Sequence, residues 1–251
     1  MRWVGDARSE AGLTERQFEV DVSGRRVPGT LWSPANGPNG PRPLVLAGHG
    51  ATHHKGIPYI VALAHLLVVR HDFAVAAIDG PGHGGRRAPH IDEIQLFSNF
   101  LTEWSRPEST DDHVAEWQAA LAALRELDEV GDGPLGYWGL SMGTIYGVPF
   151  VASEPRMQAA VLGLMGLIGP SRERMELDAK TITCPVLFVQ QWDDQMMPRQ
   201  SVFDLFDALG TIDKRLHAHP GEHSAVPPEE LRFSVEFLVR HLAPGTVDPD
   251  H

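Results

Sequence analysis

Short apolar runs alternate with longer segments of helical spacing through most of the chain, and this alternation limits the possible folds more than any other feature. Apolar runs bounded by glycine or proline suit strands that are buried on both faces. We expect strands at 17–22, 25–32, 44–47, 73–78, 135–138, 159–164, 186–190 and 214–218, and helices at 58–70, 111–130, 142–153, 201–209 and 229–242. The pattern predicts an α/β fold, a mostly parallel eight-stranded sheet with helices on both faces.

The domain organisation follows from length and from the spacing of these elements. The chain has 251 residues, of which 42% are hydrophobic, enough for one sizeable core. Neither an internal repeat nor a change in composition marks a boundary, so we expect a single domain over 1–251. The two longer excursions, 86–110 and 165–183, are candidates for a partial lid over a minimal cap.

The composition of the chain argues against several kinds of binding partner. The net charge of −12 argues against nucleic acid and anionic membranes, because both attract clustered Lys and Arg. No apolar run is long enough to span a bilayer, and residues 1–16 lack the apolar segment of a signal peptide. Cys184 is the only cysteine and so cannot form an internal disulfide. We therefore expect a cytoplasmic protein that acts on a small molecule, with its oligomeric state left open.

The run Gly139-Leu140-Ser141-Met142-Gly143 joins a predicted strand to a predicted helix. A turn this tight strains the residue at its apex and requires small neighbours on either side, as in the G-x-S-x-G nucleophile elbow. Ser141 is then a candidate nucleophile, which needs an adjacent base to be reactive. The competing interpretation is an ordinary serine N-cap of the helix.

Acidic and basic candidates also follow strands, where the chemistry of such sheets is located. Asp193 and Asp194 come after the strand at 186–190, and His219 and His223 come after the strand at 214–218. The order Ser, Asp, His is the one expected with a nucleophile elbow. His223 is the preferred base because it lies in the loop before the last helix, and His219 is its rival.

Four segments together resemble the α/β-hydrolase family, and the resemblance covers about 17–242. They are Gly48-His49-Gly50, the DGPGHG run at 79–84, the elbow at 139–143, and ITCPVL through DQMMP at 182–198, with PGEH at 220–223 beyond. The spacing to Pro198 favours Asp194 as the acid, although Gln191 stands where relatives commonly have Gly, and this leaves Asp193 open. The family also implies an oxyanion hole made by the backbone N–H groups of Ala51 and Met142.

The resemblance implies a carboxylesterase-like serine hydrolase that cleaves a small ester through an acyl-enzyme intermediate, with no cofactor. The alternatives are cleavage of a thioester, lactone, amide or C–C bond by the same residues, or a binding protein of this fold without turnover. Candidate pocket residues, which could equally be plain core, are His49, His53, Phe97, Trp104, Met165 and Trp192. We expect no metal site among His49, His53, His54 and His83, because no carboxylate or cysteine accompanies them.

Overall fold

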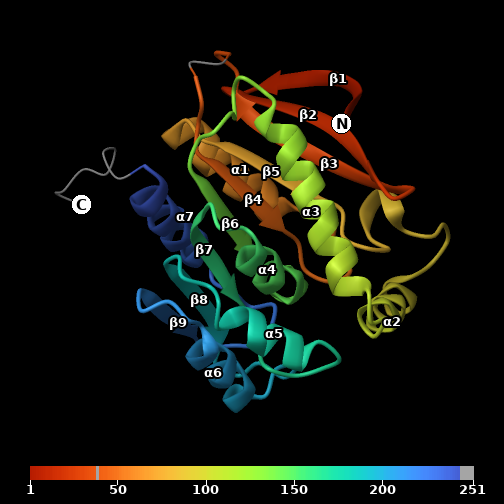
Figure 1. Cartoon of the computed structure of the whole chain (residues 1–251), viewed down its shortest axis with the longest axis vertical. Helices are drawn as coiled ribbons and strands as arrows, with labels where there is room; N and C mark the ends of the chain where they lie inside the picture. Colours follow the sequence, from red (N-terminus) through yellow and green to blue (C-terminus); the bar gives the residue numbers. More distant parts are fainter. Residues whose placement is uncertain (38–39, 244–251) are drawn as a thin grey trace.

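The structure is a computed structural model that describes residues 1–37 and 40–243, and one twisted sheet runs through it (Figure 1). The nine strands lie in the order β1-β2-β3-β5-β4-β6-β7-β8-β9. Pairing is antiparallel from β1 to β5 and parallel from β5 to β9. The strands are β1 Arg2–Glu10, β2 Leu13–Val22, β3 Arg25–Pro34, β4 Leu44–Gly48, β5 Ala74–Ile78, β6 Leu135–Gly139, β7 Met157–Gly163, β8 Val186–Gln191 and β9 Lys214–His219.

The α/β class and the mostly parallel sheet are confirmed, but the sheet has nine strands where the sequence predicts eight. The additional strand is β1, in which every residue except the half-buried Trp3 is exposed. A strand with neither face buried has no alternation of apolar and polar residues, which is the signal that identifies strands in a sequence. Backbone pairing with β2 holds β1 at the edge of the sheet.

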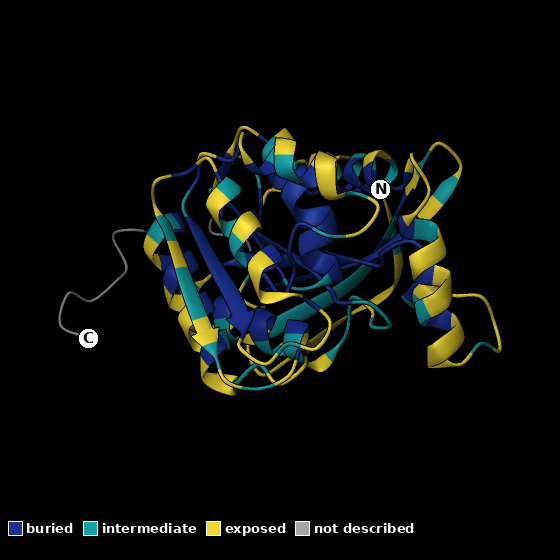
Figure 2. Cartoon of the chain, turned by 90° about the horizontal axis from the view of Figure 1, so that it is seen from below, coloured by how far each residue is buried: buried dark blue, intermediate teal, exposed yellow. Residues whose placement is uncertain are grey.

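Two layers of helix cover the sheet. Helices α1 (Pro58–His71) and α7 (Pro228–Leu242) pack on one face. The other face is covered by α2 Glu93–Trp104, α3 Ser109–Arg125, α4 Met142–Ser153, α5 Arg172–Ala179 and α6 Arg199–Ala208. Figure 2 shows buried residues in the central strands and exposed residues on the outer surfaces of the helices.

Strand β4 shows how the two layers share the sheet. Val45 and Ala47 belong to the core cluster beneath α1 and α7, whereas Leu44 and Leu46 belong to the cluster beneath α3 and α4. Successive side chains of a strand point to opposite faces, so a strand buried on both faces is apolar throughout. Burial of both faces therefore explains the continuous apolar runs in the sequence.

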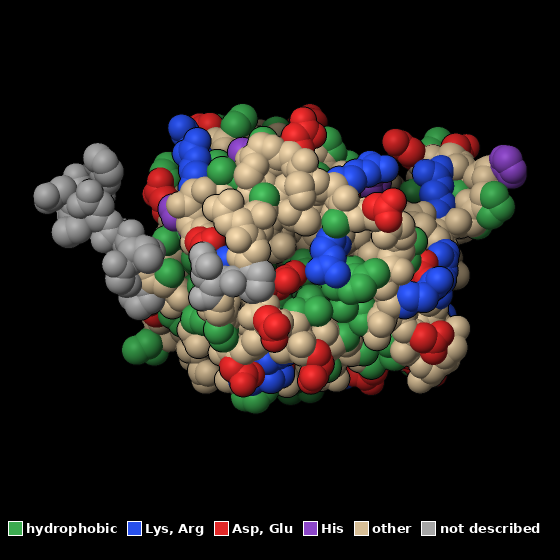
Figure 3. All heavy atoms as spheres, turned by 90° about the horizontal axis from the view of Figure 1, so that it is seen from above, with side chains coloured by type: hydrophobic (Ala, Val, Ile, Leu, Met, Phe, Trp, Pro, Cys, Tyr) green, Lys and Arg blue, Asp and Glu red, His purple; other side chains and the backbone are tan. Residues whose placement is uncertain are grey.

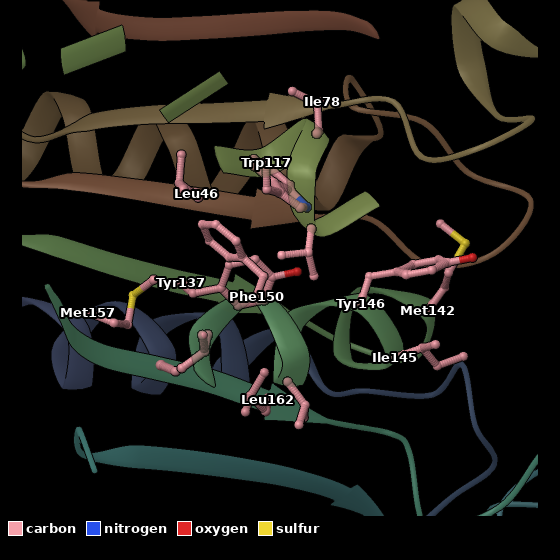
Figure 4. Packing of buried hydrophobic residues seen from close by; sticks show 14 of the residues in the cluster. Leu46, Ile78, Trp117, Tyr137, Met142, Ile145, Tyr146, Phe150, Met157 and Leu162 are labelled. Atoms are coloured by element: carbon pink, nitrogen blue, oxygen red, sulfur yellow. The ribbon is translucent and has the colours of Figure 1, made fainter. Parts of the chain in front are cut away.

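Aromatic packing fixes α4 against the sheet (Figure 4). The ring of Trp117 in α3 lies 6.1 Å from Tyr137 in β6 and 5.7 Å from Phe150 in α4, measured between centroids. All three side chains are fully buried. Because α4 begins directly after the Gly139–Gly143 turn, this packing also determines where that turn lies.

One helix is shorter than its sequence pattern predicts. The helix expected at 111–130 is α3, which begins at Ser109 and ends at Arg125. Turns follow it, with the amides of Leu127 and Val130 donating to the carbonyls of Leu124 and Leu127. Val130 is still only 1% exposed, so the apolar spacing continues after the helix has ended.

The two long excursions each contain a helix and touch one another. The first begins at the end of η1 (Gly84–Arg86) and contains α2, and the second contains α5. The indole nitrogen of Trp104 donates to Ser171 Oγ at 2.8 Å, which joins the end of α2 to the start of α5. The span 1–251 predicted as one domain includes 38–39 and 244–251, which lie outside the described residues.

The surface carries mixed charge. Figure 3 shows one face, where acidic and basic side chains are interspersed rather than separated into large patches. Within residues 1–37 and 40–243, no helix combines the length and apolar character that crossing a bilayer requires.

Candidate active site

Ser141 lies at the apex of the turn from β6 into α4 and has a strained backbone. Its φ of 57° and ψ of −118° are unfavourable for a residue with a side chain. The turn closes tightly, because a Cβ on Gly139 would lie 2.9 Å from the carbonyl oxygen of Gly143, and a Cβ on Gly143 would lie 2.6 Å from that of Gly48. Side chains at either position would push the turn apart, which is why glycine flanks the serine.

Hydrogen bonds from buried side chains support this turn from below. The hydroxyl of Tyr137 donates to the Gly143 carbonyl at 2.7 Å. Thr144 Oγ1 lies 2.8 Å from the Gly139 carbonyl and accepts from the Gly163 amide at 2.8 Å, and the Ser141 amide donates to the Gly163 carbonyl at 2.9 Å. The turn is therefore tied to β6 and β7, and Ser141 Oγ is held at the carboxyl end of the sheet.

The structure brings Ser141, His223 and Asp194 together in a hydrogen-bonded chain. His223 Nε2 lies 2.9 Å from Ser141 Oγ, and His223 Nδ1 lies 2.7 Å from Asp194 Oδ2. An ionised carboxylate only accepts, so Nδ1 carries the proton and Nε2 accepts from the serine hydroxyl. This is the tautomer in which an imidazole can act as a base toward the serine.

The side chain of Asp194 is only 3% exposed, yet its carboxyl remains ionised. Burial alone would raise the pKa of this carboxyl. Hydrogen bonds from His223 and from the amides of Met196 and Met197, the latter two at 2.8 and 3.0 Å, outweigh burial and lower the pKa below its ordinary value. A permanent negative charge thus faces the imidazole.

Asp193 and His219, the alternative candidates for acid and base, make other contacts. The carboxylate of Asp193 accepts from the Gly221 amide at 3.1 Å and shapes the loop after β9. His219 Nε2 lies 2.6 Å from the Glu230 carboxylate. The structure thus places His223, not His219, beside Ser141, and Asp194, not Asp193, against His223.

Two glutamines for which the sequence predicts no role hold the loop that carries His223. Gln195 Oε1 accepts from the His223 amide at 3.0 Å. Gln191 is fully buried, and its amide nitrogen lies 3.4 Å from the Pro220 carbonyl and 3.3 Å from that of Glu222. Gln191 stands at the position where relatives commonly have glycine, and that departure was the only signal available.

The two backbone groups expected to form the oxyanion hole come from different turns. Met142 begins α4, so its amide lies at the positive end of the helix dipole. Ala51 lies in the turn after β4, where the Gly50 amide already donates to the Tyr59 hydroxyl at 2.9 Å and the His53 amide donates to the Gly50 carbonyl at 3.3 Å. Ala51 therefore remains the expected donor from this turn.

His49 connects two loops of the site. Its Nε2 accepts from the Gly80 amide at 2.9 Å, and its Nδ1 therefore donates to the Gly50 carbonyl at 2.8 Å. Burial, and secondarily the charge of His83, lower the pKa of His49 to about 3, which keeps the ring neutral. His49 thus fixes the turn after β4 against the turn after β5.

The other expected pocket residues are scattered. Met165 is completely buried and Trp104 nearly so, and both belong to the core beneath α4, where Phe97 packs from its rim. Trp192 is 44% exposed, and the guanidinium carbon of Arg199 lies 4.0 Å from the centroid of its ring. These residues have different surroundings, and their contribution to a substrate pocket stays a prediction.

A cavity of about 310 Å³ opens between the turn after β4 and helix α2. Its lining comprises Thr52, His53, His54, Lys55, Gly84, Gly85, Arg87 and Leu96. The Lys55 ammonium is paired with the buried Asp79 at 2.9 Å, and Asp79 also accepts from the amides of Lys55 and Gly85. Of the expected pocket residues, only His53 lines this cavity.

Comparison with known proteins gives a clear result for structure. No protein-family model and no curated protein matches the chain. A cold-adapted esterase from an Arctic intertidal metagenomic library, with PEG bound, is 43% identical with a TM-score of 0.86, over 96% of this chain and 100% of that one. A zinc-bound structure of an esterase from that library has 40% identity and a TM-score of 0.80 over the same shares. Acetyl xylan esterase 1 from Thermoanaerobacterium sp. shares the fold at 16% identity and a TM-score of 0.73, over 95% and 87% of the two chains.

Proposed function

The chain belongs to the α/β-hydrolase superfamily, and from this membership we propose that it hydrolyses a carboxylic ester of a small organic molecule at Ser141. Esterases stand among its structural neighbours, including the one that is 43% identical over nearly the whole chain. The observation that carries the proposal is the hydrogen-bonded chain from Ser141 through His223 to Asp194, with contacts of 2.9 and 2.7 Å.

In the first half of the proposed reaction, His223 Nε2 takes the proton of the Ser141 hydroxyl while Oγ attacks the ester carbonyl carbon. The carbonyl oxygen becomes an oxyanion, which the amides of Met142 and Ala51 stabilise. Asp194 holds the imidazole in the required tautomer and stabilises its positive charge. His223 then donates the proton to the departing alkoxide, and the alcohol leaves an acyl-serine.

In the second half, water replaces the alcohol. His223 takes a proton from the water, and the resulting hydroxide attacks the acyl carbon. Collapse of the second oxyanion expels Ser141 Oγ, which recovers its proton from His223, and the carboxylic acid is released. No step calls for a metal or an organic cofactor.

We further infer that the cavity beside Thr52 and His53 receives one part of the substrate. Thr52, which lines this cavity, directly follows Ala51 in the sequence. The volume of the cavity falls at the small end of the range for ligand pockets. Helix α2 contributes Leu96 to its wall, so we propose that 86–110, joined to 165–183 through Trp104 and Ser171, acts as a partial lid on one domain. The cytoplasmic location and the absence of membrane partners remain predictions, and cell fractionation would test them.

The test is hydrolysis of p-nitrophenyl esters of increasing chain length by wild type and Ser141→Ala, combined with fluorophosphonate labelling read by mass spectrometry. We expect labelling at Ser141 and loss of turnover in the variant, with activity falling as the acyl chain outgrows the cavity. Ser153→Ala at the exposed end of the same helix is the matched control and should retain activity.

Other outcomes favour the alternatives. Labelling of Ser141 without ester turnover would direct the search to thioesters, lactones, amides or C–C bonds. A folded wild-type protein with neither labelling nor turnover would refute the enzymatic proposal and favour a binding protein of this fold.

A further inference from the structure

A cluster of two histidines and one glutamate lies at the edge of the sheet, separate from the proposed catalytic residues. It consists of His217 and His219 on β9 and Glu230 in the first turn of α7. His217 Nδ1 lies 3.0 Å and His219 Nε2 lies 2.6 Å from Glu230 Oε2. Residues i and i+2 of a strand share a face, so both imidazoles point from β9 toward the start of α7.

Glu230 has no permanently cationic partner among the described residues. Its side chain is only 1% exposed, and among the residues that the structure describes no Lys or Arg forms an ion pair with it. Its partners are two imidazoles, which are cationic only when protonated. A buried carboxylate that lacks a permanent cationic partner is costly, and a divalent cation would balance its charge.

The spacing of the three side chains suits a transition metal. One ligand atom from each residue lies within 4.8 Å of the other two. In a tetrahedral zinc site with bonds of about 2.0–2.1 Å, neighbouring ligand atoms are roughly 3.4 Å apart. His217 Nδ1 is already close to that distance from Glu230 Oε2. His219 Nε2 would have to move away from Oε2 by less than about 1 Å to reach it.

Access and ligand chemistry agree with this geometry. The side chains of His217 and His219 are 34% and 19% exposed, so an ion can enter from solvent while the carboxylate stays buried. Two imidazoles and one carboxylate leave the fourth position of a tetrahedral zinc ion to water. We propose that His217, His219 and Glu230 form a site for Zn²⁺ or a similar divalent transition metal.

Such an ion would act on the loop that carries His223. His219 ends β9 and Glu230 stands in the first turn of α7, so the ligands bracket the residues between them. The His219 carbonyl also accepts from the Trp192 amide at 2.6 Å, at the start of the segment that carries Asp194. The metal would join both ends of this loop and stabilise the folded chain without touching Ser141.

The test is titration of chelator-treated protein with Co²⁺, followed by its visible absorption, and with Zn²⁺, followed by calorimetry and thermal unfolding. We expect one equivalent of tetrahedral Co²⁺ and a Zn²⁺-dependent rise in Tm for wild type. Glu230→Gln should weaken Zn²⁺ binding by more than ~100-fold, whereas Glu229→Gln, its exposed neighbour, should bind like wild type.

Further variants make the outcome decisive. His217→Asn and His219→Asn test the site if Glu230→Gln fails to fold, and each should lose the Co²⁺ spectrum while keeping native circular dichroism. Absence of binding by wild type, or equal affinities in Glu229→Gln and Glu230→Gln, would overturn the proposal. So would binding that survives in Glu230→Gln but disappears in His223→Ala, because the ion would then occupy the proposed catalytic residues.

Discussion

At the scale of single residues, hydrogen bonding separates acidic groups that look alike in the sequence. Asp193 and Asp194 are adjacent, yet one carboxylate accepts from a loop amide and the other from His223. The difference arises from the turn between β8 and α6, which directs neighbouring side chains to opposite sides. No periodic pattern encodes such a turn, so only the family-like spacing to Pro198 favours Asp194 in the sequence, and Asp193 stays open there.

We predict that Asp194→Asn lowers kcat for p-nitrophenyl acetate by about 10³–10⁴-fold. An amide can donate to Nδ1 and would stabilise the wrong tautomer of His223, and it carries no charge to balance the imidazolium. Steady-state kinetics with Asp193→Asn as the matched control measures this effect. A comparable loss in Asp193→Asn would refute the assignment of the acid.

The tight turn around Ser141 gives a second prediction for single residues. In Gly143→Ala the new methyl group would lie 2.6 Å from the Gly48 carbonyl oxygen, a contact that the backbone must relieve by moving. We expect the free energy of unfolding to fall by about 1–3 kcal/mol, together with most of the proposed esterase activity. Gly56→Ala, where the nearest atoms are 3.5 Å away, should unfold like wild type in urea.

At the scale of elements, a buried ionic network connects β3, η1 and α3. Glu116 is fully buried in α3 and accepts from Arg25 at 3.0 Å, from Arg86 at 2.7 and 2.9 Å, and from His113 at 2.9 Å. Burial alone would raise the pKa of Glu116, but His113 and Arg86 lower it to about 2. The charged carboxylate thus holds together three segments that are distant in the chain.

This network predicts a pH-dependent loss of stability. The folded pKa of Glu116 lies below its ordinary value of 4.5, so the stabilisation is complete above that pH and is lost as the pH falls toward about 2. Glu116→Gln should lower the free energy of unfolding at pH 7 by about 3 kcal/mol, because buried arginine charge loses its partner. The difference between variant and wild type should shrink over the same pH range in urea unfolding curves.

An exposed pair on a neighbouring helix provides the control for this experiment. Glu103 bonds to Arg106 at 2.8 Å with side chains 25% and 46% exposed, and Glu103→Gln should change stability by less than ~1 kcal/mol. A similar loss in both variants, or a Glu116→Gln deficit that is constant with pH, would contradict the role given to the network.

Strands that are buried on both faces follow from the sequence far better than the exposed strand. Strands β4 to β8 have continuous apolar runs, and each was predicted within a few residues of its observed bounds. The exposed β1 has no such run and was missed. The pocket residues stay predictions, because apolar character does not distinguish a core side chain such as the buried Met165 from one that faces a cavity. The elbow is recognisable because the tight turn leaves no room for a Cβ on either side of the serine.

At the scale of the whole molecule, the single cysteine offers a measure of global unfolding. Cys184 is 8% exposed, and burial raises the pKa of its thiol to about 12. We predict that native protein at pH 8 reacts with a disulfide reagent only at the rate of unfolding, and that urea-denatured protein reacts at once with one equivalent. Rapid labelling of the folded protein would show instead that the segment before β8 opens locally.

The position of β4 in the sheet has a consequence for synthesis on the ribosome. Strand β4 lies between β5, which follows it closely in the chain, and β6, which begins only at Leu135. While the nascent chain grows through α2 and α3, one edge of the most central parallel strand is unpaired. That edge is apolar and prone to non-native pairing, so slow translation ahead of β6 should increase aggregation and demand for chaperones.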